Sequence, residues 1–276
     1  MLVNLKEVLD LAAAGTFAVP AFNVYNMETV MGIVQAAEET RSPLIMQTYS
    51  RLFTSGAAFY LAPSVLAAAQ KARVPVCFHL DHGAGQPEVL KALRYGCTGI
   101  MYDCSALPLD QNIEKTKQIV SICDANDVPV EGELGHIGSA ADDSVSYEYT
   151  KVDEAIEFVA QTNVVALAIQ VGTAHGHYKK APQIDVPRIA EIAGKIPAAV
   201  VLHGGSGIPD DQIRAAIDAG IRKVNFGTDV CFSFLDRVFE TSREKFAVDV
   251  FMRGPIESVK NFAIEKIKLL KADGRV

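Results

Sequence analysis

The sequence predicts an α/β protein that folds as a single (β/α)8 TIM barrel with a C-terminal helical extension. Eight short apolar runs, each followed by a turn and then by a stretch of helical periodicity, carry that prediction. The runs are apolar on both faces, as strands are in a parallel sheet that helices cover. No Pro/Gly/Ser-rich linker or charge block divides the chain, so we expect residues 1–276 to form one domain.

The eight predicted strands leave room for helices in every interval between them. Asn112–Val120, for example, has the apolar spacing of a helix. An open, doubly wound parallel sheet is the competing arrangement, but eight units in 276 residues favour a closed barrel, which has no edge strand. The predicted strands are Phe17–Val24, Pro43–Tyr49, Val74–Asp81, Gly99–Ser105, Val128–Leu134, Val164–Val171, Ala198–His203 and Lys223–Thr228.

A further amphipathic helix is predicted behind the last strand. Such an apolar stripe packs either on a neighbouring subunit or within the chain's own core, and the spacing alone allows both. The stripe consists of Ile256, Val259, Ala263, Ile267 and Leu270.

Composition excludes several classes of protein. The formal net charge is −7, and no Lys/Arg stripe is interleaved with aromatic residues, so we expect no nucleic-acid partner. No apolar run approaches the ~20 residues that span a bilayer, and the N-terminus lacks the pattern of a signal peptide. The five cysteines are scattered without a CxxC pair, which predicts reduced thiols and a cytoplasmic protein without a membrane partner.

Polar and glycine-rich residues collect just past the C-terminal ends of the predicted strands. In a (β/α)8 barrel these ends share one face, and that face carries the active site. The strand ends carry Asn23, Asp81–Gly83, Asp103–Ser105, Glu131, Glu133, Gly172–Gly176, His203–Gly207 and Asn225–Asp229.

Three of the six histidines predict a metal site. His82, His175 and His203 follow the third, sixth and seventh predicted strands, whose loops converge on the barrel axis. Three imidazoles with an open fourth position form the ligand set of a catalytic zinc ion. The alternative is three polar side chains at the rim of the loops, without a metal.

The other histidines fit structural roles better. His79 lies inside a predicted strand, and His136 begins a loop in which we expect no converging partner. His177, two residues past His175, is a competing candidate ligand.

A glycine-rich turn predicts a phosphate site. Gly204–Gly207 leaves the seventh strand just before a predicted helix, and Asn225–Thr228 forms a second such loop after the eighth strand. Glycines let backbone N–H groups approach an anion, and a helix N-terminus adds positive potential. A glycine turn without a ligand is the alternative. No P-loop motif occurs, so a nucleotide site is not indicated.

Asp81 is the candidate acid–base group, because it precedes His82 and faces the same cavity. It would move a proton to and from a substrate hydroxyl, or it would orient a neighbouring histidine, and the sequence leaves both roles open. No predicted strand has a lysine near its C-terminal end, and Lys223 stands at the start of the eighth. Carbonyl activation by a metal is therefore favoured over imine formation.

At this point the chain resembles the metal-dependent class II ketose-bisphosphate aldolases, the fructose- and tagatose-bisphosphate aldolases, over nearly its full length. Several motifs in the right order carry the resemblance, and together they are specific where one alone is not. They are Phe22–Val24, His79–Gly83, Glu133–Gly135, Gly172–Gly176, Leu202–Gly207 and Lys223–Asn225.

The resemblance implies one Zn²⁺ on His82, His175 and His203, proton transfer by Asp81, a dimer or tetramer, and a sugar-phosphate substrate. A monovalent cation is a further cofactor that we consider. The substrate-binding residues predicted are Gly176, Lys179, Gly204, Gly205, Ser206, Asn225, Phe226, Gly227 and Thr228, with Asn23, Asp103, Ser105 and Glu133 supporting them and Arg253 as a distal anion contact.

Three departures from the family pattern concern the aldehyde half of the substrate. The loop glutamate that assists deprotonation is replaced by Ala141, which leaves Asp142 or Asp143 as the substitute. The fourth-strand Asp-Gly-Ser reads Asp103–Ser105, with Cys104 in the middle, and the second strand ends in Gln47–Arg51 instead of a turn of small residues. The metal and phosphate residues are intact.

The leading hypothesis is therefore reversible aldol cleavage of a ketose 1,6-bisphosphate or 1-phosphate. Two alternatives remain: a metal-assisted epimerase or isomerase of a sugar phosphate, and a non-catalytic protein that binds a phosphosugar.

Overall fold

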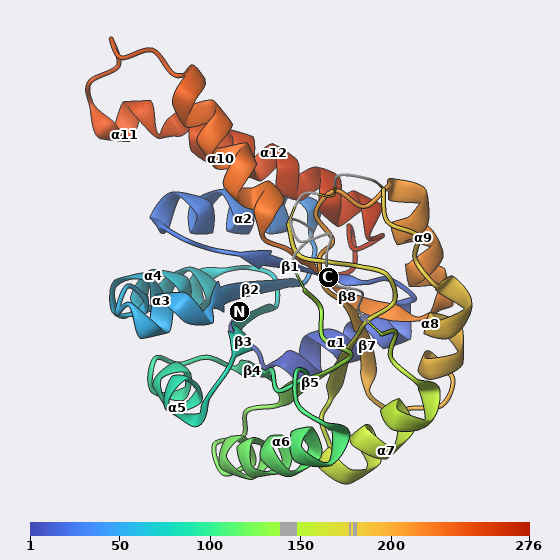
Figure 1. Cartoon of the computed structure of the whole chain (residues 1–276). Helices are drawn as coiled ribbons and strands as arrows, with labels where there is room; N and C mark the ends of the chain where they lie inside the picture. The colour runs from blue at the N-terminus through green and yellow to red at the C-terminus, as the bar shows by residue number, and fades with distance from the viewer. Residues whose placement is uncertain (139–147, 177, 179–180) are drawn as a thin grey trace.

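The computed structural model describes residues 1–138, 148–176, 178 and 181–276. Eight parallel strands follow one another in sequence order and close into a barrel in which β8 pairs with β1 (Figure 1). The predicted (β/α)8 architecture is confirmed. The strands are β1 (Val19–Asn23), β2 (Leu44–Tyr49), β3 (Val76–Gly83), β4 (Gly99–Tyr102), β5 (Val130–Leu134), β6 (Ala166–Ile169), β7 (Ala199–Leu202) and β8 (Ile221–Phe226).

Helices surround the barrel and bury the outer faces of the strands (Figure 1). They are α1 (Leu5–Gly15), α2 (Met27–Thr40), α3 (Ser50–Thr54), α4 (Ala58–Lys71), α5 (Gln86–Arg94), α6 (Leu109–Asp124), α7 (Val152–Thr162), α8 (Val186–Ala193), α9 (Asp210–Ala219), α10 (Thr228–Glu240), α11 (Val248–Phe251) and α12 (Arg253–Leu269). Within the described residues, no helix is both long and apolar enough to cross a membrane.

Helix α1 packs across the N-terminal end of the barrel. Asn4 begins this helix with a capping box, in which its side chain accepts from Glu7 N and the Glu7 side chain accepts from Asn4 N. Leu5 and Val8 are fully buried, and Leu5 N donates to Thr98 O at the start of β4. Helix α1 thus covers this end of the barrel. The cavity described below lies at the opposite end, where the strands finish.

The C-terminal apolar stripe packs within the chain. Val259, Ala263 and Ile267 of α12 are fully buried, and α12 contacts α2. The two helices come close at Gly32, where an added Cβ would lie 2.7 Å from Ile256 O. Of the two packings that the spacing allows, the structure therefore shows the intramolecular one.

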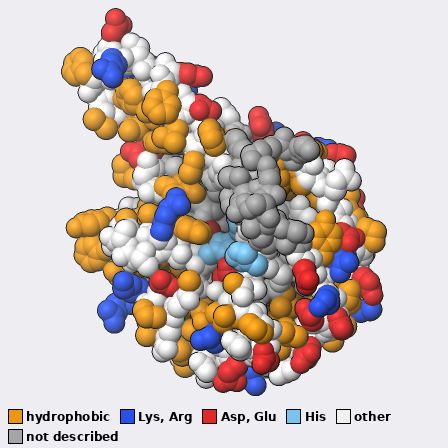
Figure 2. All heavy atoms as spheres, in the orientation of Figure 1, with side chains coloured by type: hydrophobic (Ala, Val, Ile, Leu, Met, Phe, Trp, Pro, Cys, Tyr) orange, Lys and Arg blue, Asp and Glu red, His pale blue; other side chains and the backbone are white. Residues whose placement is uncertain are grey.

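The outer part of the C-terminal extension projects from the barrel. Helices α10 and α11 and the start of α12 form an arm that leaves the barrel wall (Figure 1), and hydrophobic side chains gather on it (Figure 2). Phe239 and Phe246 are 81% and 92% exposed. The arm thus carries apolar surface that this chain leaves in contact with solvent.

Candidate active site

A cavity of about 510 Å³ opens at the C-terminal end of the barrel, with histidine side chains in the hollow (Figure 2). Side chains from every part of the barrel reach it because the strand ends converge there. Its described lining residues are Asn23, Tyr25, Gln47, Tyr49, Ser50, Arg51, Asp81, His82, Ala84, Asp103, His136, Ile137, Gly138, His175, Gly176, Gly204, Ser206, Asn225, Gly227 and Thr228.

The three histidines of the predicted metal site meet in this cavity region. The ring centroids of His175 and His203 lie 4.8 and 4.9 Å from that of His82, and their nearest ring nitrogens lie within 4.8 Å of one another. Each ring also binds a protein oxygen through its other nitrogen, which fixes its orientation. The orienting groups are Asp103 for His82, Ile137 O for His175 and Glu131 for His203.

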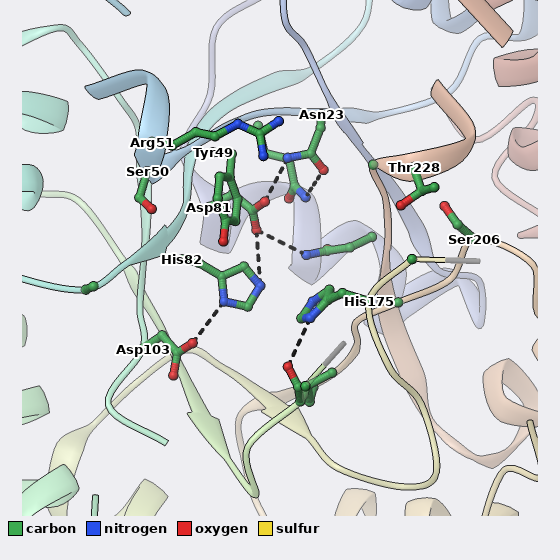
Figure 3. A pocket seen from close by; sticks show the side chains of 18 of the residues that line it. Asn23, Tyr49, Ser50, Arg51, Asp81, His82, Asp103, His175, Ser206 and Thr228 are labelled. Carbon is green, nitrogen blue, oxygen red and sulfur yellow. Dashed lines mark hydrogen bonds and ion pairs between the residues drawn. The ribbon is translucent and has the colours of Figure 1, made fainter. Parts of the chain in front are cut away.

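His82 stands at an irregular point of β3. Its φ is +52°, in the left-handed region, and the register with β4 shifts between Leu80 and Gly83. His82 Nδ1 lies 3.0 Å from Asp103 Oδ2, so Nε2 is left for a ligand (Figure 3). Burial opposes the charged form of this ring, but the neighbouring Asp81 and Asp103 carboxylates raise its pKa to about 9. The site therefore holds strong negative potential around His82.

The other two rings are held as neutral imidazoles. Burial, with the nearby His82, lowers the pKa of His175 to about 4 and that of His203 well below its ordinary value. His175 Nε2 and His203 Nδ1 are buried without a hydrogen-bond partner in the described structure. A buried polar atom without a partner is costly, and a neutral imidazole nitrogen is a good metal ligand. The residues present therefore fit a metal ion.

Asp81 is fixed beside this group by amide side chains. Asn23 Nδ2 donates to Asp81 Oδ2 at 2.7 Å, and Gln47 Nε2 donates to Asn23 Oδ1 at 2.9 Å (Figure 3). Asn225 Nδ2 is 3.5 Å from Asp81 Oδ1, and that same oxygen lies 3.8 Å from His82 Nε2. Asn23, which the sequence predicts as a supporting residue, thus contacts Asp81, and Gln47, named from the sequence only as the start of the departing segment Gln47–Arg51, contacts Asn23.

Glu133, Ser105 and His136 form a second polar cluster under the rim. Ser105 Oγ lies 2.7 Å from Asp103 Oδ1, 2.9 Å from Glu133 Oε1 and 3.1 Å from His136 Nδ1. The expectation that His136 has no converging partner is wrong, because the β4 and β5 ends bring Ser105 to it. Burial, with the nearby Asp103, raises the pKa of Glu133 to about 8. Asp103 contacts His82 directly, and Ser105 contacts Asp103 in turn.

The two predicted phosphate loops lie side by side. Gly205 N donates to Asn225 O at 3.0 Å, and Ser206 Oγ accepts from Asp229 N, in the first turn of α10. Gly204 has φ +68°, and a Cβ there would collide with Ala174 O. Gly204, Ser206, Gly227 and Thr228 line the cavity beside the start of α10, whose N-terminal end adds positive potential.

Other predicted residues lie elsewhere. The Phe226 side chain is fully buried against Phe22 and Phe262, and Gly205 packs on Val224, so neither lines the cavity. Arg253 stands on the projecting arm and not among the lining residues. Lys179, Asp142, Asp143 and His177 lie outside the described residues.

The profile of the family described as fructose-bisphosphate aldolase class-II matches residues 3–275 of the chain. The chain belongs to this family. It is therefore a class II aldolase, an enzyme that makes and breaks a carbon–carbon bond, and its family is generally metal-dependent.

Individual relatives agree over the full length. The uncharacterized protein YdjI of Escherichia coli K12 is 35% identical over 279 residues, covering 100% of this chain and 99% of that protein. The crystal structure of the YdjI aldolase gives a TM-score of 0.91 at 33% identity, covering 100% and 99% of the two chains.

Structures from two other organisms share the fold. A putative fructose-1,6-biphosphate aldolase from Coccidioides immitis has a TM-score of 0.91 at 26% identity, covering 99% of this chain and 97% of that one. Fructose-bisphosphate aldolase from Campylobacter jejuni has a TM-score of 0.84 at 21% identity, covering 100% and 97%.

This class II aldolase carries an amine inside its barrel, on the residue that the sequence placed at the start of the eighth strand. Lys223 is the third residue of β8, is fully buried, and places Nζ 2.7 Å from Glu131 Oε2. A lone buried ammonium is costly, and the carboxylate of Glu131 across the barrel compensates it.

Arg51 gives the cavity a positive charge that the sequence showed only as a departure from the family. Its guanidinium lies 5.1 Å from the Tyr49 ring and 6.0 Å from the Tyr25 ring (Figure 3). Among the described lining residues it is the one Lys or Arg side chain. Because Tyr49 pairs in register with Asp81, Arg51 lies on the β2 side of Asp81.

Proposed function

We propose that this class II aldolase catalyses the reversible cleavage of a fructose- or tagatose-type ketose 1,6-bisphosphate, or a related ketose 1-phosphate, to dihydroxyacetone phosphate and an aldehyde. The proposed metal is Zn²⁺. One observation carries the proposal: two buried histidine nitrogens without partners lie in the same cavity region as a positioned carboxylate and two anion-binding loops.

His82, His175 and His203 would hold the metal, through His82 Nε2, His175 Nε2 and His203 Nδ1. A divalent metal held there would supply Lewis acidity towards the C2 carbonyl oxygen of the substrate. Asp103, Ile137 O and Glu131 keep the three ligand nitrogens aimed at one point.

Asp81 moves the proton at the substrate's C4 hydroxyl. In cleavage its carboxylate accepts that proton as the C3–C4 bond breaks, the bond electrons pass to C3, and C4 becomes the aldehyde carbon. In condensation Asp81 returns the proton to the aldehyde oxygen. The hydrogen bond from Asn23 leaves Asp81 Oδ1 facing the cavity side, near His82 Nε2. The proton exchanged at C3 is assigned to the loop with Asp142 and Asp143, which stays a prediction.

The loops after β7 and β8 hold the phosphate of the dihydroxyacetone phosphate half. The donors are the Ser206 and Thr228 hydroxyls, the N-terminal end of α10 and the backbone N–H groups of Gly204–Gly207 other than that of Gly205, which binds Asn225 O. This set binds an anion without a surface lysine, which is compatible with the acidic composition.

We further propose a homodimer or homotetramer, because the projecting arm exposes Phe239, Phe246 and Val248. The role of Arg253 as a distal anion contact across such an interface stays a prediction.

Metal removal and release of triose phosphate test the proposal together. Chelation should abolish activity and Zn²⁺ should restore it, while Asp81→Asn should retain the metal and lose about 10²–10⁴ in kcat. Asp110→Asn, an exposed carboxylate in the first turn of α6, should be fully active.

The substrate panel should pair phosphorylated with unphosphorylated aldehydes, because Arg51 offers a positive charge beyond Asp81. Full activity after chelation would overturn the proposal. So would exchange of a C–H proton with no triose phosphate released, which is the outcome for an epimerase.

A further inference from the structure

A buried ion pair crosses the barrel behind the candidate metal ligands. Lys223 Nζ of β8 lies 2.7 Å from Glu131 Oε2 of β5, and the other carboxylate oxygen, Oε1, lies 2.9 Å from His203 Nε2 of β7. All three side chains are 0% exposed. Strands β5 and β8 are not neighbours in the barrel, so the pair spans its interior.

The Lys223 ammonium and the Glu131 carboxylate stabilise each other in the barrel interior. Glu131 is the carboxylate recorded in ion-pair range of Lys223 among the described residues, and a buried ammonium or carboxylate without its partner is strongly disfavoured. Lys223 therefore occupies Glu131 Oε2 and leaves Oε1 as the acceptor for His203.

The hydrogen bond from His203 sets which of its nitrogens is free. Because Glu131 accepts, His203 Nε2 carries the hydrogen, and the Nδ1 lone pair faces the position shared with His82 and His175. That Nδ1 is buried without a hydrogen bond and lies 3.5 Å from Glu133 Oε2. The orientation of the ligand nitrogen thus depends on where the Glu131 carboxylate points.

A competing partner for Glu131 lies next to it. His79 Nε2 is 3.6 Å from Glu131 Oε2 and makes no hydrogen bond in the described structure. If Oε2 lost the ammonium of Lys223, the carboxylate could rotate towards His79 and leave His203. Lys223 occupies Oε2 and keeps Oε1 on His203.

We propose that Lys223 is a positioning residue for metal binding, which acts through Glu131 to hold His203 in the orientation that presents Nδ1. The proposal rests on the metal site assigned above, and nothing in it requires Lys223 to touch substrate. It gives the buried amine of β8 a function other than imine formation.

The test is the affinity of the metal-free protein for Co²⁺, measured by chelator competition, together with the visible absorption spectrum of the Co²⁺ form. Lys223→Met should weaken Co²⁺ binding about tenfold and change the absorption bands, since groups behind a ligand typically tune affinity by 10–100-fold. Leu44→Ala, a fully buried core truncation in β2, is the control for lost stability and should bind Co²⁺ with wild-type affinity and spectrum.

A double variant keeps the test decisive if Lys223→Met does not fold. Lys223→Met/Glu131→Met replaces the whole ion pair with apolar side chains, which buried sites often tolerate. It should fold, and it should bind Co²⁺ at least tenfold more weakly than wild type because His203 Nε2 has lost its acceptor.

Wild-type affinity in either variant would overturn the proposal. Failure of the proposed function looks different: the wild-type protein itself would bind no metal, or would stay active after chelation.

Discussion

At the residue scale, the site is built from buried polar side chains, and a hydrogen bond to a specific neighbouring side chain compensates the cost of burying most of them. Asp81 has Asn23, His82 has Asp103, and His203 has Glu131. His79 is the exception, because both of its ring nitrogens are buried without a hydrogen bond. Burial, with the nearby Lys223 ammonium, lowers the pKa of His79 to about 3.

His79 should therefore make the metal-free protein less stable in acid. Between pH 6.5 and about 3 the unfolded chain binds a proton that the folded ring does not, so the free energy of unfolding falls as the pH falls through that window. His79→Leu removes this one contribution. From pH 7.5 to pH 5 the variant should gain about 2 kcal/mol relative to wild type, at about 1.4 kcal/mol for each of the 1.5 pH units below 6.5.

Urea unfolding of both metal-free proteins at the two pH values measures that difference. A difference between the proteins that is the same at pH 5 and pH 7.5 would show that folded His79 titrates normally.

At the element scale, the loops after β7 and β8 act as one unit. The Gly205–Asn225 backbone hydrogen bond joins them, and the Tyr178 hydroxyl ties the Gly204 carbonyl to Ala174 N. This arrangement brings the backbone at Gly204 close to Ala174 O, which leaves no room for a Cβ. The loop after β7, proposed above to bind phosphate, therefore depends on a glycine for two reasons, its positive φ and this close approach.

Gly204→Ala should raise KM for the phosphorylated substrate and lower the free energy of unfolding by about 1–3 kcal/mol, the usual cost of a strained backbone conformation. The measurements are steady-state kinetics and thermal unfolding. Gly254→Ala, at the start of α12, is the matched control, because an added Cβ there meets only the flexible Arg237 and Thr241 side chains. Unchanged KM in Gly204→Ala would remove this loop from the phosphate site.

At the scale of the whole molecule, barrel closure brings the candidate site together, and the projecting arm exposes an apolar surface. Closure brings the ends of β3, β6 and β7 together, and with them His82, His175 and His203. The arm leaves the barrel and keeps large apolar side chains in solvent (Figure 2). Exposed apolar groups of this kind are typical of a surface that a partner covers.

Replacing Phe239 and Phe246 together with Ser should shift the protein to a smaller assembly, because the two rings are 81% and 92% exposed in the single chain. Sedimentation velocity at several concentrations gives the mass. Phe59→Ser, which changes a half-exposed ring on α4 away from the arm, should leave the mass unchanged. Equal masses for all three proteins would contradict the assignment of the arm as an interface.

The sequence by itself determined the barrel, the three histidines, Asp81 and the two phosphate loops. These features are local: an apolar run predicts a buried strand, and a polar or glycine-rich residue just after it predicts a position on one face. Parallel strands share that face in any closed barrel, so residues far apart in the chain could be assigned to one site.

Only the tertiary structure decided the contacts that cross the barrel. Glu131 and Lys223 stand 92 positions apart on strands that are not neighbours, and Ser105, after β4, meets His136, after β5. No spacing in the sequence encodes which interior side chains face each other, because that depends on the stagger and tilt of the closed sheet. Likewise, the periodicity of the apolar stripe on α12 fits packing on a neighbouring subunit and packing within the chain equally well. In the structure the stripe is buried within the chain, where α12 contacts α2.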